Sequence, residues 1–357
     1  MWPYWIIFMF PALASIVNSR TLSDQLRGSL CFTLKKSWWL VIAFLTIFIG
    51  LRYRVGGDWG NYERSLHGLE FRSLTESTIS GDPGYRLLEW LCIQNDWGIT
   101  GVNLIGSILF SFGLVVFCRN LPRPWLALSV AIPYLVIVVA MGYTRQGIAI
   151  GLAMLGLVAL GHQSTGKFIF WVLLGATFHK SAVLLLPIAA LAATKKRLWT
   201  AIWIAMVVVI AYLVLLEKSV DTLYANYIEA EYQSQGALIR LSMNVIPAII
   251  LLLWRRRFEM SLPQLRLWLW MSVTSSCLFF LYFFVPASTA IDRVALYMLP
   301  LQLAIFAHIP EVFGIHRGRN TLFTMAILLY YAAVQFVWLN YATHARSWLP
   351  YQNWLFL

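Results

Sequence analysis

The sequence predicts an all-α integral membrane protein, a polytopic bundle of transmembrane helices. Of its residues 60% are hydrophobic and only 12% are charged, and the mean hydropathy is +0.71. Soluble domains of this length do not have such a composition. The apolar runs are continuous and do not alternate, which excludes a β-barrel. Because a backbone in lipid must satisfy its own polar groups, and about 20 apolar residues cross a bilayer, a helical bundle is expected.

About twelve segments are predicted as spans of a single transmembrane domain, residues 1–357. The run 167–193 can form one span with His179 and Lys180 near its middle, or two short spans. Two spans place the basic clusters on the inner face, as the positive-inside rule favours. We therefore expect both termini outside, in the periplasm. The segments lie near 3–17, 38–51, 99–117, 125–141, 146–161, 167–178, 181–193, 198–216, 239–254, 267–285, 294–309 and 321–339.

Two predicted outer regions are longer than turns. Residues 52–98 form a large external loop, in which the amphipathic pattern of 85–94 predicts a helix lying in the membrane interface. Residues 217–238 form a second external loop, which carries Tyr224, Tyr227 and Tyr232 with Glu229 and Glu231. The net charge of +12 arises from the inner basic clusters, so it gives no reason to expect a nucleic-acid partner.

Polar residues interrupt the apolar pattern at five places, each at the end of a predicted span. With the topology above, all five lie at the outer face of the membrane. This coincidence predicts one functional site there. The five places are Arg52-x-Arg54-x-x-Gly57-Asp58-x-x-x-Tyr62, Thr144-Arg145-Gln146, Phe178-His179-Lys180-Ser181, Arg240, and Asp292-Arg293-x-x-x-Tyr297.

Arginine dominates the positive charge of the predicted outer face, where we count nine Arg and two Lys. A planar guanidinium binds phosphate oxygens at two points and stays charged when partly desolvated, whereas Lys acts as a flexible point charge. The excess therefore suggests an anionic ligand. Alternatively, these side chains reach up to lipid headgroups or pair with Asp58, Asp292 or Glu63.

Neither a metal site nor a disulfide is indicated by the cysteines. The four are scattered among a predicted inner loop, an outer loop, a helix end and a span. Their spacing matches no zinc or disulfide pattern. No cofactor is expected, since the sequence has no phosphate-cradling glycine loop and no Asp-x-Asp pair on the outer face that could bridge a metal to a pyrophosphate.

At these positions the chain resembles the EpsG family of exopolysaccharide and O-antigen (Wzy-type) polymerases. The resemblance covers roughly residues 50 to 300. It implies an enzyme of the bacterial inner membrane that joins oligosaccharide repeat units carried on undecaprenyl pyrophosphate, with membrane lipid and a chain-length regulator as further partners. The matching residues are Arg52…Gly57-Asp58…Tyr62, Arg145-Gln146-x-x-Ala149, Phe178-His179-Lys180-Ser181-Ala182 followed by Pro187, and Asp292-Arg293-x-x-x-Tyr297.

The residue types suit this chemistry. Glycan transfer from a lipid pyrophosphate expels an anionic leaving group, which Arg145 and Arg293 would stabilise. The acceptor hydroxyl needs a base, for which His179 and Asp58 are both candidates; a salt bridge from Asp58 to Arg52 or Arg54 is the alternative role. Asp292 is expected to orient Arg293. The expected substrate-binding residues are Arg52, Arg54, Gly57, Tyr62, Gln146, Lys180, Arg240, Asp292, Tyr297 and Tyr351.

Three alternatives to a polymerase remain. An O-antigen ligase would use the same donor and the same cationic site, and would differ only in its acceptor. A lipid-linked glycan flippase or exporter would need polar residues along the bundle interior, where this sequence has few. An acyltransferase could also use a His at the membrane face, but no acyl-donor motif is visible.

Overall fold

The computed structural model describes residues 1–17, 34–69, 81–192, 197–211, 236–285, 288–314 and 321–357. Within these residues the chain is helical, apart from one isolated bridge between Arg52 and Asn353. The principal helices are α1 (Trp2–Val17), α2 (Lys36–Gly50), α3 (Trp59–His67), α5 (Pro83–Gln94), α6 (Gly98–Arg119), α7 (Pro124–Ala131), α8 (Thr144–Gly161), α9 (Thr165–Phe178), α10 (Leu186–Ala192), α11 (Arg197–Ala211), α13 (Ala237–Trp254), α14 (Leu262–Leu281), α15 (Ser288–Ala295), α16 (Leu299–Val312) and α17 (Thr321–Tyr341). Shorter 3₁₀ or π elements are η2 (Ile132–Ala140), η3 (Lys180–Leu185), η7 (Arg255–Arg257), η8 (Leu296–Met298), η9 (Ala345–Ser347) and η10 (Trp354–Phe356).

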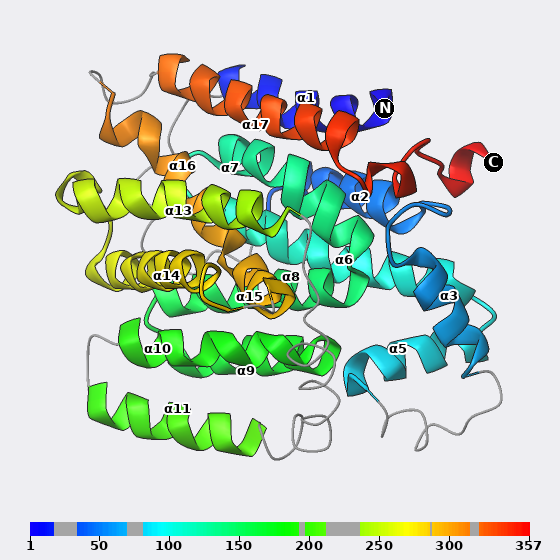
Figure 1. Ribbon diagram of the computed structural model, residues 1–357, viewed down its shortest axis with the longest axis horizontal. Helices are drawn as coiled ribbons and strands as arrows, with labels where there is room; N and C mark the ends of the chain where they lie inside the picture. The colour runs from blue at the N-terminus through cyan, green and yellow to red at the C-terminus, as the bar shows by residue number, and fades with distance from the viewer. Residues whose placement is uncertain (18–33, 70–80, 193–196, 212–235, 286–287, 315–320) are drawn as a thin grey trace.

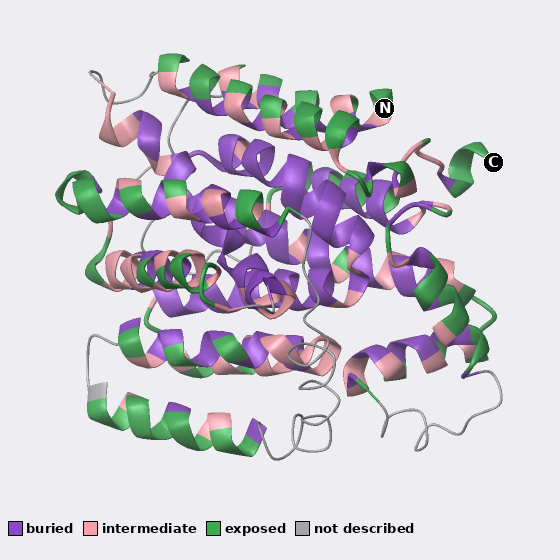
Figure 2. Ribbon diagram, viewed as in Figure 1, coloured by how far each residue is buried: buried purple, intermediate pink, exposed green. Residues whose placement is uncertain are grey.

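Helix α8 lies at the centre of the bundle, with 94% of its residues buried. Small residues let its neighbours approach closely, as is common between membrane helices. A Cβ on Gly113 of α6 would lie 2.0 Å from the carbonyl oxygen of Gly151 in α8. On another side of α8, a Cβ on Gly175 of α9 would lie 3.1 Å from the Ala149 carbonyl oxygen. Figure 2 shows the resulting buried centre, with exposed faces on the outer helices α1, α11 and α17.

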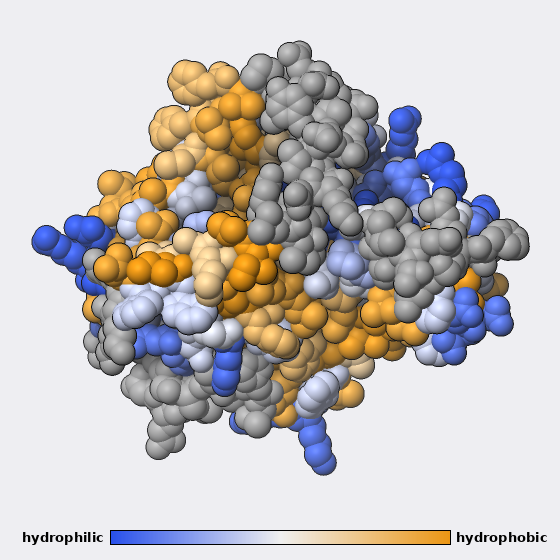
Figure 3. Space-filling view, turned by 90° about the horizontal axis from the view of Figure 1, so that it is seen from below, coloured by the Kyte–Doolittle hydropathy of each residue, from blue (hydrophilic) through white to orange (hydrophobic). Residues whose placement is uncertain are grey.

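Among the described residues, five helices are long and apolar enough to cross a membrane: Gly98–Arg119, Thr144–Gly161, Ala237–Arg257, Ser288–Val312 and Thr321–Tyr341. Six more apolar helices in that part of the chain have 10–17 residues. Where a predicted segment is described, it coincides with a helix or a succession of helices; residues 212–216 of the segment 198–216 lie outside the described chain. Length and composition identify five spans, so the count of twelve and the orientation of the termini stay predictions. Hydrophobic residues cover much of the middle of the face in Figure 3, and hydrophilic residues gather toward its two ends.

The run 167–193 is divided at His179, as the two-segment interpretation expects. His179 has an extended backbone, with φ −154° and ψ 111°, and ends α9. The chain then reverses, so that η3 and α10 run back beside α9 (Figure 1). His179 therefore lies at the tip of a helical hairpin, at an end of the bundle.

The predicted interfacial helix at 85–94 is confirmed as a helix, α5. It begins with Asp82 at the N-cap and Pro83 in the first turn, an arrangement that favours helix initiation. A buried ion pair fixes it, since Arg86 donates to Glu89 at 2.8 Å and Glu89 accepts from Ser65 of α3 at 2.9 Å. Of the second predicted loop, 217–238, residues 217–235 lie outside the described part of the chain.

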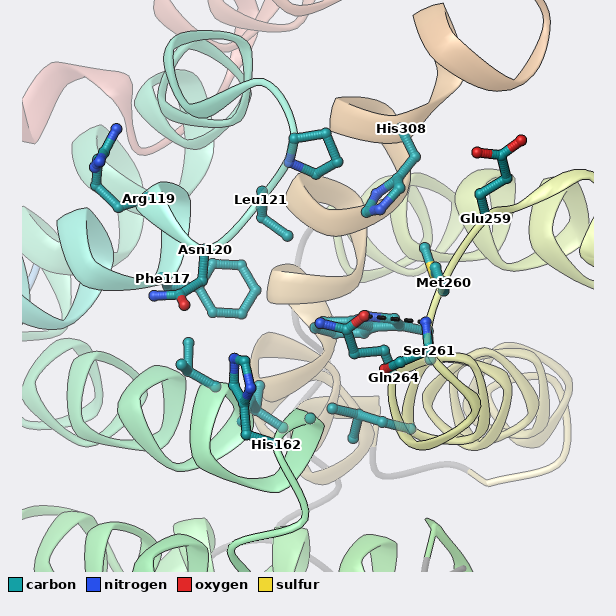
Figure 4. Close-up of a pocket in the computed structure, with 16 residues that line it drawn as sticks. Phe117, Arg119, Asn120, Leu121, His162, Glu259, Met260, Ser261, Gln264 and His308 are labelled. Atoms are coloured by element: carbon teal, nitrogen blue, oxygen red, sulfur yellow. Dashed lines mark hydrogen bonds between the residues drawn. The ribbon is translucent and has the colours of Figure 1, made fainter. Parts of the chain in front are cut away.

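The bundle has two chemically different ends. Hydrogen bonds join the five polar places of the sequence at one end: Arg52 with Thr144, Gln146 with Arg293, Asp292 with Arg240, and Ser181 with Tyr297. Helices α3 and α5 lie at the right in Figure 1. A cavity of about 150 Å³ lies at the opposite end, between the last turns of α6 and α8 and the start of α14. Arg119, His162, Glu259 and His308 are among the residues lining it (Figure 4). It is therefore separate from the predicted site.

Candidate functional site

Arg145 lies in the first turn of α8 and faces several polar and aromatic groups. Its Nη1 lies 3.3 Å from Oδ2 of Asp82, and its guanidinium lies over the rings of Tyr62 and Tyr85, 5.8 Å from each centroid. The side chain keeps 43% of its surface exposed. Arg145 is thus held on one side by protein groups and open on the other, as a cation that binds a ligand must be.

Asp82 connects three elements, although the sequence analysis did not identify it. One carboxylate oxygen meets Arg145, and the other accepts a hydrogen bond from the Lys180 backbone N–H at 3.3 Å. Burial raises the pKa of Asp82, and the nearby Arg145 opposes that rise. The sequence signal that could have found it is Asp82-Pro83, an N-cap followed by proline at the start of a helix.

His179 begins a hydrogen-bonded chain at the tip of the α9–η3 hairpin. Its Nδ1 lies 2.6 Å from Ser181 Oγ, and the Ser181 hydroxyl donates to the Tyr297 hydroxyl at 3.2 Å. Burial, reinforced by the positive charges of Arg145 and Arg293, lowers the pKa of His179 to about 3. The imidazole is therefore neutral at neutral pH, which is the form able to accept a proton.

Arg293 is oriented by Gln146 of α8. The Arg293 Nη1 donates to Gln146 Oε1 at 3.1 Å, and the Gln146 amide donates back to the Arg293 carbonyl at 2.8 Å. The guanidinium also lies over the Tyr143 ring, 4.7 Å from its centroid. Since Gln146 follows Arg145 in the chain, this exchange of hydrogen bonds places Arg293 near the Arg145 group.

Asp292 pairs with Arg240, and the expectation that it orients Arg293 is wrong. The two Asp292 oxygens lie 2.6 and 2.7 Å from Arg240 Nε and Nη2, a bidentate geometry. Their side chains are 9% and 14% exposed. The carboxylate of Asp292 therefore points to Arg240 of α13, while Gln146 of α8 bonds the Arg293 guanidinium.

Asp58 precedes α3 and lies in the field of the same arginines as His179. Burial raises the pKa of Asp58, while Arg293 and Arg145 lower it. Its carboxylate accepts a long hydrogen bond from the Asn61 amide at 3.5 Å. Neither Arg52 nor Arg54 forms an ion pair with it among the described residues, so the salt-bridge role is not supported.

Arg52 is placed differently from expectation, because the protein itself satisfies its guanidinium. The side chain is 2% exposed. It donates to the carbonyls of Val55 and Ile49 at 3.0 and 2.6 Å, and to Asn103 and Thr144 at 2.8 and 2.9 Å. These bonds join α2, α6 and α8, so Arg52 serves the scaffold and is not available to a substrate.

Three other expected binding residues also lie apart from the Arg145 group. Arg54 is exposed and lies over the Tyr53 ring, 5.2 Å from its centroid. Tyr351 donates to the Phe48 carbonyl at 2.9 Å, and the Tyr351 and Phe48 rings stack with their centroids 4.6 Å apart. Gly57 faces Trp348, whose ring would lie 3.4 Å from an added Cβ. The contacts of Tyr351 and Gly57 pack the C-terminal segment against α2 and the loop that follows it.

Thus the structure gathers part of the predicted site into one cluster, called here the arginine cluster: Asp58, Tyr62, Asp82, Arg145, Gln146, His179, Lys180, Ser181, Arg240, Asp292, Arg293 and Tyr297. These residues belong to, or directly flank, α3, α5, α8, α9, η3, α13, α15 and η8. No group of three His, Cys, Asp or Glu among the described residues is arranged to hold a metal ion.

A comparison with protein families places the chain. The sequence model of the EpsG family matches residues 35–353, which is most of the chain, and the protein belongs to this family. The resemblance stated from the motifs is thereby confirmed. The protein is of the polysaccharide-polymerase type and is a membrane protein by its apolar helices. Searches of curated proteins and of solved structures gave no match.

Proposed function

We propose that this protein is a glycosyltransferase that polymerises oligosaccharide repeat units carried on undecaprenyl pyrophosphate. The observation that carries the proposal is the placement of two candidate bases, His179 and Asp58, beside the same two cations, Arg145 and Arg293. An anionic leaving group and a hydroxyl to be deprotonated are the two demands of this reaction. Family membership supports the same class of activity.

In the proposed reaction, a hydroxyl oxygen of the acceptor glycan attacks the anomeric carbon of the donor. A new glycosidic C–O bond forms while the bond between that carbon and the pyrophosphate oxygen breaks. Undecaprenyl pyrophosphate leaves with the bonding electron pair, and Arg145 and Arg293 stabilise its charge. The hydroxyl proton passes to the base. No metal is needed to balance this step.

We favour His179 as the base and keep Asp58 as the alternative. Nδ1 of His179 lies against Ser181, so the substrate proton would reach Nε2, in the tautomer in which Nδ1–H donates to Ser181 Oγ. A pyrophosphate bound at Arg145 and Arg293 would offset the positive charges that lower the pKa of His179. Donor binding would therefore make the imidazole more basic when the acceptor arrives. Asp58 lacks such a fixed partner, apart from the long contact with Asn61.

The proposal is tested by deleting the gene in the host bacterium and analysing its surface glycans. A polymerase deletion should remove long chains and leave single repeat units on their normal acceptor. Complementation with His179→Ala should fail to restore long chains, although the variant inserts and is produced normally. We expect general-base loss to cost roughly 10²–10⁴-fold in rate.

The same analysis separates the alternatives. Loss of every transfer to the final acceptor, single repeats included, would indicate a ligase. Accumulation of lipid-linked repeats at the inner leaflet would indicate a flippase. Long chains from both His179→Ala and Arg145→Ala would refute the assigned site.

We also propose that the arginine cluster faces the outside of the bacterial inner membrane. The Arg255–Arg257 cluster ends α13 at the opposite end of the bundle from Arg240, and the positive-inside rule favours such a cluster in the cytoplasm. Cysteine labelling tests this orientation in a background without native Cys. Arg346→Cys should react with a membrane-impermeant maleimide in intact cells, whereas Arg256→Cys should react only after lysis; the reverse pattern would invert the topology.

A further inference from the structure

We infer that Asp82 is a positioning residue of the glycosyl transfer, holding both Arg145 and the turn that carries His179. The inference rests on the proposed function and adds a residue to it. Asp82 is the one described carboxylate that touches the cation and the hairpin tip together, through separate oxygens at 3.3 Å each. Its side chain is 11% exposed, against 43% for Arg145.

The contact with Arg145 sets the direction of the guanidinium. Tyr62 and Tyr85 flank Arg145 with their ring faces, and Tyr62 also forms a hydrogen bond with it. Asp82 supplies a directional contact at Nη1. A two-point grip on a phosphate depends on the plane of the guanidinium. The carboxylate therefore presents the remaining donors of Arg145 to the substrate side.

The contact with Lys180 sets the backbone turn. His179 is extended, and the chain enters a 3₁₀-helix immediately after it. The Lys180 N–H is among the first donors of that element, which have no partner within it. By accepting this N–H, Asp82 fixes the turn on which the His179 ring and the Ser181 hydroxyl depend.

The position of Asp82 is itself rigidly determined. It caps α5, whose second residue, Gly84, packs on α9: an added Cβ would lie 2.4 Å from Thr177 Oγ1. Farther along α5, the fully buried Glu89 binds Arg86 and Ser65. Helix α5 is thereby fixed to α9, which ends at His179, and to α3, which begins after Asp58. Both Asp82 oxygens accept from protein groups, so Asp82 could take the acceptor proton only by giving up one of these contacts.

The test uses the full-length protein in nanodiscs and lipid-linked repeat units extracted from the deletion strain. Asp82→Asn removes the charge at Arg145 but keeps an oxygen for Lys180. Asp82→Ala removes both contacts. We expect Asp82→Asn to lower kcat roughly 10- to 100-fold, the cost of small misplacements of reacting groups, with a smaller change in KM. Asp82→Ala should be slower still, and Asp82→Glu should recover part of the loss.

A double-mutant comparison keeps the inference falsifiable if a single variant is poorly folded. Because Asp82 acts partly through Arg145, Asp82→Asn should cost much less in an Arg145→Lys background than alone. Full additivity of the two losses would overturn that half of the inference. Asp96→Asn is the matched control: Asp96 is exposed at the far end of α5 with φ +55°, a conformation that Asn tolerates, and its activity should be normal.

The outcomes separate this inference from the proposed function. Wild-type kcat and KM for Asp82→Asn, together with inactive Arg145→Ala and His179→Ala, would refute the role of Asp82 and leave the function standing. Active Arg145→Ala and His179→Ala proteins would refute the assigned site, whereas wild-type protein that forms no polymer from lipid-linked repeat units would refute the function itself. A lower thermal midpoint with unchanged kcat and KM would show that Asp82 is structural only.

Discussion

Arg52 and Arg145 are both arginines at helix ends on the same side of the bundle, yet their surroundings differ completely. Arg52 is 2% exposed and donates to four protein oxygens. Arg145 keeps 43% of its side chain exposed, with one carboxylate contact, two ring faces and a hydrogen bond with Tyr62. A guanidinium has five N–H donors, so the number already used by the protein decides whether a ligand can bind. The lesson is that residue type and position suggest a cation site, while donor satisfaction defines it.

The largest expected effect concerns Arg145. Arg145→Ala should lower kcat roughly 10²–10³-fold, because a preorganised charge at the leaving group is lost. Arg145→Lys should also be strongly impaired, since an ammonium cannot reproduce the two-point phosphate geometry. Transfer rates in nanodiscs check both variants.

Arg346→Lys, an exposed site at the same end of the bundle, serves as the control for the Arg145 variants and should be unaffected. Full activity of Arg145→Lys would favour lipid-headgroup binding for Arg145.

An intermediate effect is expected at Arg52, and on stability instead of catalysis. Arg52→Lys leaves one ammonium to serve acceptors on α2, α6, α8 and the following loop, so several lose their partners. Hydrogen bonds to charged groups are worth about 1.5–3 kcal/mol each, and we expect a loss of roughly 3 kcal/mol. Thermal unfolding in detergent measures it. If Arg52→Lys instead had normal stability but bound undecaprenyl pyrophosphate more weakly, Arg52 would be a ligand-binding residue, as we propose for Arg145, and the contrast between the two arginines would be wrong.

The smallest effect is a difference between two pH profiles. His179 has a pKa lowered to about 3 in the free protein, so it stays neutral, and kcat/KM should hold as pH falls through the reference imidazole value of about 6.5. Bound pyrophosphate offsets the arginine charges and raises that pKa, so kcat should fall at a higher pH than kcat/KM does. Rates measured between pH 4 and 8 would show the separation.

Asp58 and His179 are distinguished by the same profiles. His179→Gln should abolish the acid limb of kcat along with most of the activity. If the limb survives in His179→Gln but disappears in Asp58→Asn, the base is Asp58.

Several features of this protein were determined by its sequence alone. Apolar runs predicted the helical membrane bundle, because lipid admits few other backbones. The distribution of basic clusters favoured two segments over one in 167–193, because the positive-inside rule places such clusters on the inner face. The amphipathic pattern of 85–94 predicted α5. The motif order at the span ends predicted the EpsG family, as the match over 35–353 shows.

The tertiary structure alone decided which polar residues act together. Asp292 precedes Arg293 in the chain, yet its carboxylate contacts Arg240 while Gln146 orients Arg293. Asp82 lies in no recognised motif, but the docking of α5 on α9 brings it to both Arg145 and Lys180. Arg52 fits the motif, but its guanidinium donates to two backbone carbonyls and to the side chains of Asn103 and Thr144. Side-chain partners depend on helix packing between residues far apart in sequence, and a pattern read along the chain contains no record of those distances.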